Sequence, residues 1–113
     1  YPFLNFQKKV KNYKSVYHLL PARLDTRDLK FNRNEFIELM SEKYEIKVIV
    51  QFYPLYRYDF FKKINKKKVS LKNTDLFFDN MISFPFHEWM SDEDFNYMIK
   101  STHSAIKELL SVK

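Results

Sequence analysis

The sequence predicts a small α/β fold of the α+β kind, in which an open sheet of three or more strands carries the two longer helices on one face. Three observations support this prediction. The run Val48, Ile49 and Val50 is β-branched and suits a buried strand. Two segments repeat apolar residues at helical spacing behind a capping residue. A chain of 113 residues that is 45% hydrophobic has room for one core. We therefore expect residues 1–113 to form a single domain.

The first 24 residues are expected to hold a lead-in segment and one strand. In residues 1–14 the apolar side chains of Phe3, Leu4 and Phe6 are followed by four lysines, and we expect a helix or the tail of one here. Residues 16–24 read as a strand that Pro21 bends or breaks, which favours an edge position because proline has no N–H to give to a ladder. His18 lies in this strand; a lone histidine there is more often structural than catalytic, although its titration range suits either role.

The next segment predicts a helix followed by a second strand. Asn32 and Glu35 have capping-box spacing, and apolar residues then recur at helical intervals, so residues 34–44 are expected to form an amphipathic helix. A strand over 46–53 follows directly. Strand, helix and strand in succession form a β-α-β element, and the sequence leaves open whether the two strands are neighbours.

The second strand delivers three candidate binding residues to a corner rich in rings. It ends on Gln51, Phe52 and Tyr53 and is stopped by Pro54. Beyond the proline lie five more large apolar or aromatic residues: Leu55, Tyr56, Tyr58, Phe60 and Phe61. Two interpretations remain open: this corner is one wall of a pocket, or it is an ordinary core segment with a kinked exit.

The last third of the chain predicts a helix, a strand and a long helix. Residues 74–81 are expected to be helical, and residues 82–86 to form a strand ending at Pro85. Ser91 is the expected N-cap of the final helix, with acidic residues at 92–94 in its first turn, where the helix dipole favours anions. One continuous apolar face follows, and His103 lies off it. Its members are Phe95, Met98, Ile99, Thr102, Ile106, Leu109 and Leu110.

Composition excludes several kinds of site. The chain has no Gly, which rules out a Gly-rich phosphate loop, and no Cys, which rules out a disulfide or a thiolate metal site and fits a reducing compartment. No apolar run approaches the roughly 18 residues that span a bilayer. The three histidines lack metal-ligand spacing, and no catalytic constellation can be assembled. The net charge is +6, and lysines gather at 62–68 in either a solvated loop or a contact to phosphate.

Four segments resemble, in order and spacing, the C-terminal small domain of the DegT/DnrJ/StrS sugar aminotransferases. Residues 17–21 (YHLLP) resemble the family's "HLYPI" strand, and residues 48–56 (VIVQFYPLY) its "V-x-V-H-Y-x-P-L-H" segment. Residues 71–86 are similar to the stretch ending in "ilsLPlhp", and the helix behind Ser91 to the closing "LtdeevdrVi" helix. The match departs from the family pattern at Gln51 and Tyr56 (frequently His), at Phe52 (often Tyr) and at Glu45 (commonly Gly).

The resemblance implies a part of a pyridoxal-phosphate-dependent enzyme of the aspartate aminotransferase fold type. Such enzymes move an amino group, commonly from glutamate, to a keto sugar carried on a nucleotide diphosphate. In the family, the Schiff-base lysine lies in a larger upstream domain, so we expect this chain alone to bind no cofactor and to be inactive. We expect a cytoplasmic homodimer formed through that larger domain, with no membrane partner. The start at Tyr1, without an initiator Met, also predicts a piece of a longer protein.

The resemblance assigns substrate-binding roles to five residues and leaves other functions as alternatives. His18, Gln51, Phe52, Tyr53 and Tyr56 are expected to line the sugar-nucleotide side of the cleft. A second hypothesis is a basic nucleic-acid-binding module, because 19% of the residues are aromatic and the charge is positive; such a module stacks bases on rings and contacts phosphate through lysines. The resemblance disfavours a nucleic-acid partner. A purely structural dimerisation domain is a third hypothesis.

Overall fold

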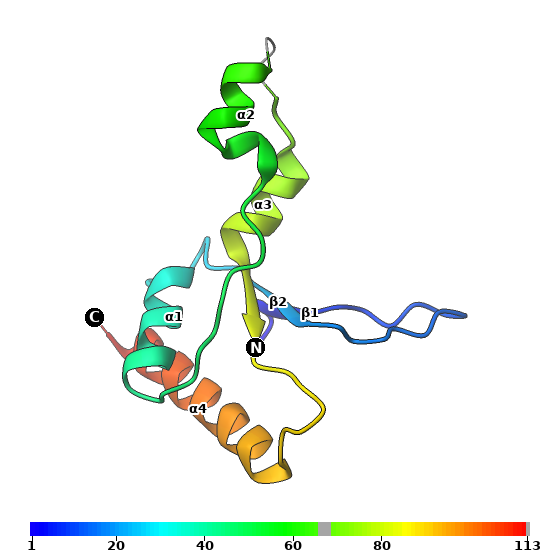
Figure 1. The fold of residues 1–113 in the computed structure, drawn as a ribbon. Coiled ribbons are helices and arrows are strands. Elements are labelled where there is room, and N and C mark those ends of the chain that lie inside the picture. The colour runs from blue at the N-terminus through cyan, green and yellow to red at the C-terminus, as the bar shows by residue number, and fades with distance from the viewer. Residues whose placement is uncertain (66–68, 113) are drawn as a thin grey trace.

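The computed structural model describes residues 1–65 and 69–112, which form a three-stranded sheet, four α-helices and one 3₁₀ turn (Figure 1). In chain order the elements are β1 (Leu4–Phe6), β2 (Leu20–Leu24), α1 (Arg33–Glu42), η1 (Leu55–Arg57), α2 (Asp59–Ile64), α3 (Lys72–Asn80), β3 (Met81–Phe84) and α4 (Asp92–Ser111). Both strand pairs are antiparallel, in the order β1-β2-β3.

The two longer helices pack on one face of this sheet, as the sequence predicted. Ala22 pairs with Ile82, so both side chains point to the same face, and both belong to the buried cluster that contains Phe36 of α1 and Ile106 of α4. Figure 1 shows α1 and α4 side by side on that side of the strands. The cluster as a whole comprises Ala22, Leu24, Phe31, Phe36, Met40, Ile46, Val48, Ile82, Phe84, Met98, Ala105 and Ile106.

Pro21 does not mark an edge strand, because β2 is the central strand. Ser83 exchanges both of its backbone hydrogen bonds with Ile49, at 3.0 and 2.8 Å. Pro21 and Ser83 are therefore a non-hydrogen-bonded pair, and the nitrogen of Pro21 faces the side of β1. Since β1 ends at Phe6, opposite Ala22, this nitrogen lies beyond the last paired residue and no ladder bond is lost. The strand is also shorter than the predicted 16–24.

The expected helix in residues 1–14 is wrong. Leu4–Phe6 instead pairs with Ala22–Leu24, and Asp25 N–H donates to the carbonyl of Phe3 at 2.8 Å. This strand pairing connects residues about twenty positions apart, which no local periodicity reveals. The lysines that follow lie outside any helix or strand.

The predicted strand over 46–53, and with it the β-α-β element, is also wrong. Only Ile49 pairs with the sheet, as an isolated bridge to Ser83. Glu45 has a φ of 54°, in the left-handed region that favours glycine, and Val48 N–H donates back to the carbonyl of Ile46. The chain therefore enters this segment through a turn. Val48 is buried and Ile49 and Val50 are half-buried, without forming a continuous ladder.

The helix starts follow the capping chemistry. The Asn32 side chain accepts from Asn34 and Glu35 N–H, while Glu35 accepts from Asn32 N–H at 2.6 Å, which completes the predicted capping box. Ser91 Oγ accepts from Asp94 N–H at 3.0 Å and caps α4, as predicted. Element ends differ by a few residues from the sequence prediction in α1, α3 and β3.

Two segments project from this body and give the molecule an extended shape (Figure 1). One contains α2 and α3, and the other is the connection from β1 to β2. The radius of gyration is 16.3 Å, against about 13 Å for a compact chain of this length. Lys62 and Lys63 of the predicted lysine loop belong to α2, and its residues 66–68 lie outside the described part of the chain.

Candidate functional site

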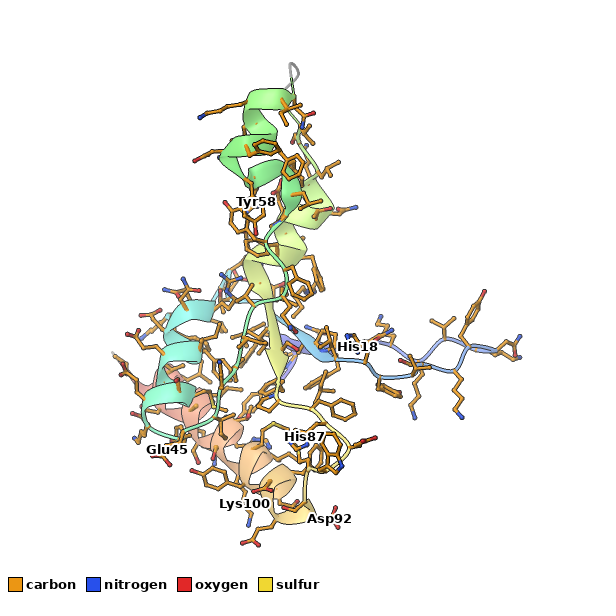
Figure 2. The ribbon with its side chains drawn as sticks, in the orientation of Figure 1. His18, Glu45, Tyr58, His87, Asp92 and Lys100 are labelled. Carbon is orange, nitrogen blue, oxygen red and sulfur yellow. The ribbon has the colours of Figure 1, made fainter. Side chains whose placement is uncertain are left out.

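The aromatic corner after Gln51 is built by edge contacts between rings from two elements. Pro54 is buried and turns the chain into η1. The ring of Tyr53 lies 4.8 Å from that of Tyr58 and 5.3 Å from that of Phe78 in α3, both edge-on. Figure 2 places Tyr58 at the lower end of α2, beside α3. The corner therefore holds η1 against α3 and is not part of the buried cluster beneath the sheet.

A charged cluster reinforces the same junction. Arg57 Nε donates to Asp75 Oδ1 at 2.7 Å, and Arg57 Nη1 donates to Asp79 Oδ1 at 2.7 Å. The Tyr56 hydroxyl donates to Asp75 Oδ1 at 2.7 Å, and the guanidinium of Arg57 lies 5.1 Å from the centre of the Phe78 ring. Two carboxylates thus neutralise Arg57, which leaves it a structural clamp instead of a free phosphate ligand.

The pKa directions agree with this arrangement. Hydrogen bonds from the Tyr56 hydroxyl and from Arg57 hold the pKa of Asp75 below its usual value. Hydrogen bonds from Arg57 likewise lower the pKa of Asp79, and both carboxylates raise the pKa of Arg57. Burial and the bond to Asp75 raise the pKa of the Tyr56 hydroxyl. All four groups keep their usual charge state at neutral pH.

Sequence reasoning missed this cluster, although one signal could have found it. Asp75 and Asp79 are four residues apart in a segment that was predicted to be helical, so both carboxylates lie on one helix face. Their partner Arg57 lies 18 and 22 positions earlier, across a turn that the sequence did not reveal. A hollow of about 470 Å³ adjoins the cluster and is lined by Tyr56, Arg57, Lys62, Asn65, Val69, Ser70 and Asp75.

Gln51 presents an unpaired acceptor on the other face of the sheet. Stepping two residues along the antiparallel bridge of Ile49 with Ser83 places Gln51 opposite Met81, and Gln51 N–H contacts Met81 Sδ at 3.2 Å. Met81 in turn pairs with Arg23 of β2, so the three side chains form a row that points away from α1 and α4. Gln51 Oε1 and Arg23 Nε are both buried with no hydrogen-bond partner among the described residues. Buried polar atoms are normally hydrogen-bonded, so these two atoms single out Gln51 and Arg23 as candidate binding residues.

The structure brings some of the five candidate residues together and separates others. Tyr53 and Tyr56 both lie near Arg57. The Tyr53 hydroxyl donates to the Arg57 carbonyl at 3.5 Å, and the Tyr56 hydroxyl shares the acceptor Asp75 Oδ1 with the Arg57 side chain. Phe52 follows Gln51 and is 76% exposed. His18 is also exposed and lies at the base of the β1–β2 connection (Figure 2). It precedes Leu20, which pairs with Phe84, whereas Gln51 is opposite Met81; the two residues therefore flank opposite ends of β3.

A second hollow of about 320 Å³ lies between β1, β3 and α4. It is almost entirely apolar, with Phe6, Phe84 and Phe95 among its lining residues. His103, which the sequence analysis set aside, also lines it, and His103 Nδ1 lies 3.4 Å from the Tyr1 hydroxyl. This hollow contains none of the five candidate residues.

The described residues include neither a metal-ligand cluster nor a buried lysine. Within residues 1–65 and 69–112, no group of three or more His, Asp or Glu residues could hold a metal ion. Every lysine in this part of the chain is exposed, whereas a Schiff-base lysine needs a desolvated setting that lowers its pKa. None of the helices described is long and apolar enough to cross a bilayer.

Comparison with known proteins gives a family match over most of the chain. The DegT/DnrJ/EryC1/StrS aminotransferase family matches residues 2–103. Two curated relatives are MJ1066, an uncharacterized protein of Methanocaldococcus jannaschii, and SpsC, a spore coat polysaccharide biosynthesis protein of Bacillus subtilis. MJ1066 is 31% identical over 102 residues, 89% of this chain, and SpsC is 24% identical over 93 residues, 81% of this chain. The chain spans only 25% and 24% of these relatives' own lengths.

Solved structures share the fold at low sequence identity. Spr1654 of Streptococcus pneumoniae, described as a sugar aminotransferase and solved in its PMP form, matches with a TM-score of 0.80 and 23% identity. That match covers 96% of this chain and 27% of Spr1654. PseC of Helicobacter pylori, an aminotransferase in pseudoaminic acid biosynthesis, matches with a TM-score of 0.77 and 22% identity over 99% of this chain and 29% of PseC.

Proposed function

Because the chain belongs to the DegT/DnrJ/EryC1/StrS aminotransferase family, we propose that it is the C-terminal small domain of a sugar aminotransferase that depends on pyridoxal phosphate. The proposed reaction transfers an amino group from a donor such as glutamate to a keto sugar carried on a nucleotide diphosphate. The observation that carries the proposal is the family match over residues 2–103, by a chain that spans about a quarter of its relatives.

The proposed division of labour follows the family resemblance. The cofactor, which carries the amino group between donor and acceptor, is assigned to the larger upstream part of the enzyme. This chain contributes one wall of the cleft and no step of the chemistry. We assign the enzyme to the cytoplasm as a homodimer, and we expect the chain alone to be inactive.

The proposed substrate contacts are side chains that are exposed or carry an unpaired polar atom. Gln51 is half-buried and its Oε1 has no partner among the described residues, so a small rotation of the side chain lets this oxygen accept a hydrogen bond from a sugar hydroxyl. The exposed ring of Phe52 supplies an apolar platform, and Tyr53 lies next to it in the chain. The Tyr56 hydroxyl is engaged by Asp75, so its role is to position the corner. His18 contributes from the opposite end of β3.

The test uses the natural protein that carries this chain, titrated with pyridoxal phosphate and assayed with glutamate and a nucleotide-linked keto sugar. We expect an absorbance band for the bound cofactor. We expect Gln51→Ala to raise the KM for the keto sugar about tenfold, the value of one hydrogen bond of about 1.4 kcal/mol, with the cofactor band unchanged. Phe60→Ala removes an exposed ring on α2 and is the matched control, with an unchanged KM.

Two outcomes contradict the proposal at different levels. A protein that stays colourless with added cofactor, and transfers no amino group, overturns the assigned reaction. A coloured, active enzyme in which Gln51→Ala and Phe60→Ala have the same KM overturns the assigned substrate wall and leaves the reaction in place.

A further inference from the structure

The connection between β1 and β2 forms an arm with no helix or strand of its own. We define the basic arm as residues 7–19. Strand pairing ends at Phe6 and Ala22, and the arm then extends away from the body (Figure 1). At its tip Tyr13 N–H donates to the Val10 carbonyl at 3.2 Å, and Asn12 has a φ of 69°, which closes a tight turn. The arm is therefore held mainly at its base.

The arm is strongly cationic and carries no compensating acid. Four of its thirteen positions are lysines, and the first acidic residue of the whole chain is Asp25. All four lysines are exposed, and none takes part in an ion pair among the described residues. These lysines are Lys8, Lys9, Lys11 and Lys14. A cluster of like charges on a projecting segment creates a local positive field that attracts anions.

The same arm exposes large apolar side chains beside its charges. Tyr13 is 81% exposed and Val16 is 89% exposed, and Val10 at the tip is also exposed. These residues face solvent because the arm has no layer beneath it. A projecting turn that combines several lysines with valine and tyrosine matches a surface that is anionic outside and apolar just below.

We propose that the basic arm docks on an anionic lipid surface, with its lysines at the headgroups and Val10, Tyr13 and Val16 at the boundary of the acyl region. Lipid explains both halves of the arm's composition. Nucleic acid would engage the lysines and the tyrosine rings, but it offers nothing to the two valines. A second copy of this chain would offer the acidic start of α4, so salt-sensitive self-association is an outcome that the test has to distinguish from lipid binding. The contact is at the surface and needs no membrane-spanning helix, and it departs from the sequence-based expectation that the chain has no membrane partner.

The test measures co-sedimentation of the purified protein with vesicles. We expect binding to vesicles of phosphatidylcholine mixed with phosphatidylglycerol, no binding to phosphatidylcholine alone, and weaker binding as salt rises. Each lysine near an anionic surface is worth about a fivefold change in partition coefficient. Replacing all four arm lysines by Gln should therefore lower the partition coefficient by about two to three orders of magnitude.

A matched variant separates local from overall charge. Replacing four exposed lysines on the body by Gln changes the net charge by the same amount, and we expect at most a fewfold loss of binding. These control positions are Lys47, Lys72, Lys100 and Lys107. Equal losses in the two four-lysine variants would show a non-specific charge effect and overturn the proposal.

The valines separate lipid from other polyanions. Val10→Ser with Val16→Ser keeps every lysine, and we expect about a tenfold loss of vesicle binding, since each substitution removes two methyl groups from the acyl boundary and adds a hydroxyl. An unchanged partition coefficient contradicts docking at the acyl boundary. Failure to bind anionic vesicles, with tight binding of single-stranded RNA or salt-sensitive self-association instead, assigns the arm to another partner and overturns the proposal. The arm lies outside the buried cluster, so circular dichroism should show an unchanged fold in every variant.

Discussion

Arg57 Nε lies 2.7 Å from Asp75 Oδ1 and joins η1 to α3 across 18 positions of sequence. The same guanidinium also bonds Asp79, one helical turn further along α3. Since α2 lies between η1 and α3 in the chain, this clamp fixes the base of the α2–α3 projection. In the proposed enzyme, it also holds the aromatic corner that follows Gln51 in a defined position.

Removing the clamp should loosen the projection without unfolding the body. We expect Arg57→Met to speed chymotrypsin cleavage at Phe60 and Phe61 about five- to tenfold, because proteolysis of a native chain follows the population of its open form. Arg27→Met breaks an ion pair with Asp25 at the body and is the matched control, with unchanged cleavage. Equal cleavage rates in the two variants would show that Arg57 does not hold the projection.

The carboxylates of this cluster should make stability depend on acid. The pKa values of Asp75 and Asp79 in the folded protein lie below the usual 3.8. The stability that these carboxylates add is therefore fully present above pH 3.8 and is lost as the pH falls through their folded pKa values. We expect the melting temperature to be flat from pH 7 to about 5 and to fall below about 4. In thermal melts followed by circular dichroism, the melting temperature of the double variant Asp75→Asn with Asp79→Asn should fall less steeply with decreasing pH than that of the control variant Asp28→Asn. Identical slopes would contradict the role of the clamp.

Two phenylalanines should differ widely in their effect on stability. Phe36 is fully buried and its ring lies 6.4 Å from that of Phe84, so Phe36→Ala should cost about 3–5 kcal/mol of unfolding free energy. Phe52 is 76% exposed, and Phe52→Ala should change the unfolding free energy by no more than about 0.5 kcal/mol. Urea denaturation measures both. A large loss in Phe52→Ala would assign this ring to the core and remove it from the proposed substrate wall.

Gln51 should be worth more to binding than to stability. Its Oε1 is buried without a partner, which costs free energy, so Gln51→Met should leave the unfolding free energy unchanged or raise it by about 1 kcal/mol. The same variant should weaken binding of the keto-sugar substrate in the natural protein. Gln7→Met, on the exposed arm, is the control for the change of side chain. A marked loss of stability in Gln51→Met would show that Gln51 has a structural partner.

The starts of α1 and α4 were predictable because their signals are local. Each cap satisfies backbone groups no more than four residues away: the capping box of Asn32 and Glu35 in α1, and Ser91 in α4. Both helix starts therefore follow from the local sequence. The departure of Glu45 from the family's usual Gly marked a real backbone feature, since its φ is 54°. The sequence also predicted the family correctly.

Strands and the candidate site were harder to predict because they depend on distant partners. Val48 to Val50 has strand composition, but only Ile49 finds a backbone partner, in β3 more than thirty positions away. Leu4–Phe6 has little strand character and becomes β1 because β2 offers it an open edge. In the site, Tyr53 and Tyr56 meet at Arg57, whereas His18 and Gln51 lie at opposite ends of β3.

The sequence by itself determined the helices α1, α3 and α4, the caps of α1 and α4, and the family, because these depend on neighbours within one or two helical turns or on motif order. The tertiary structure decided which segments pair as strands, that β2 is central despite Pro21, and that Arg57 is bound by two carboxylates. Each of these depends on which groups of distant residues satisfy each other's hydrogen bonds and charges, and such partners are fixed only when the whole chain has packed.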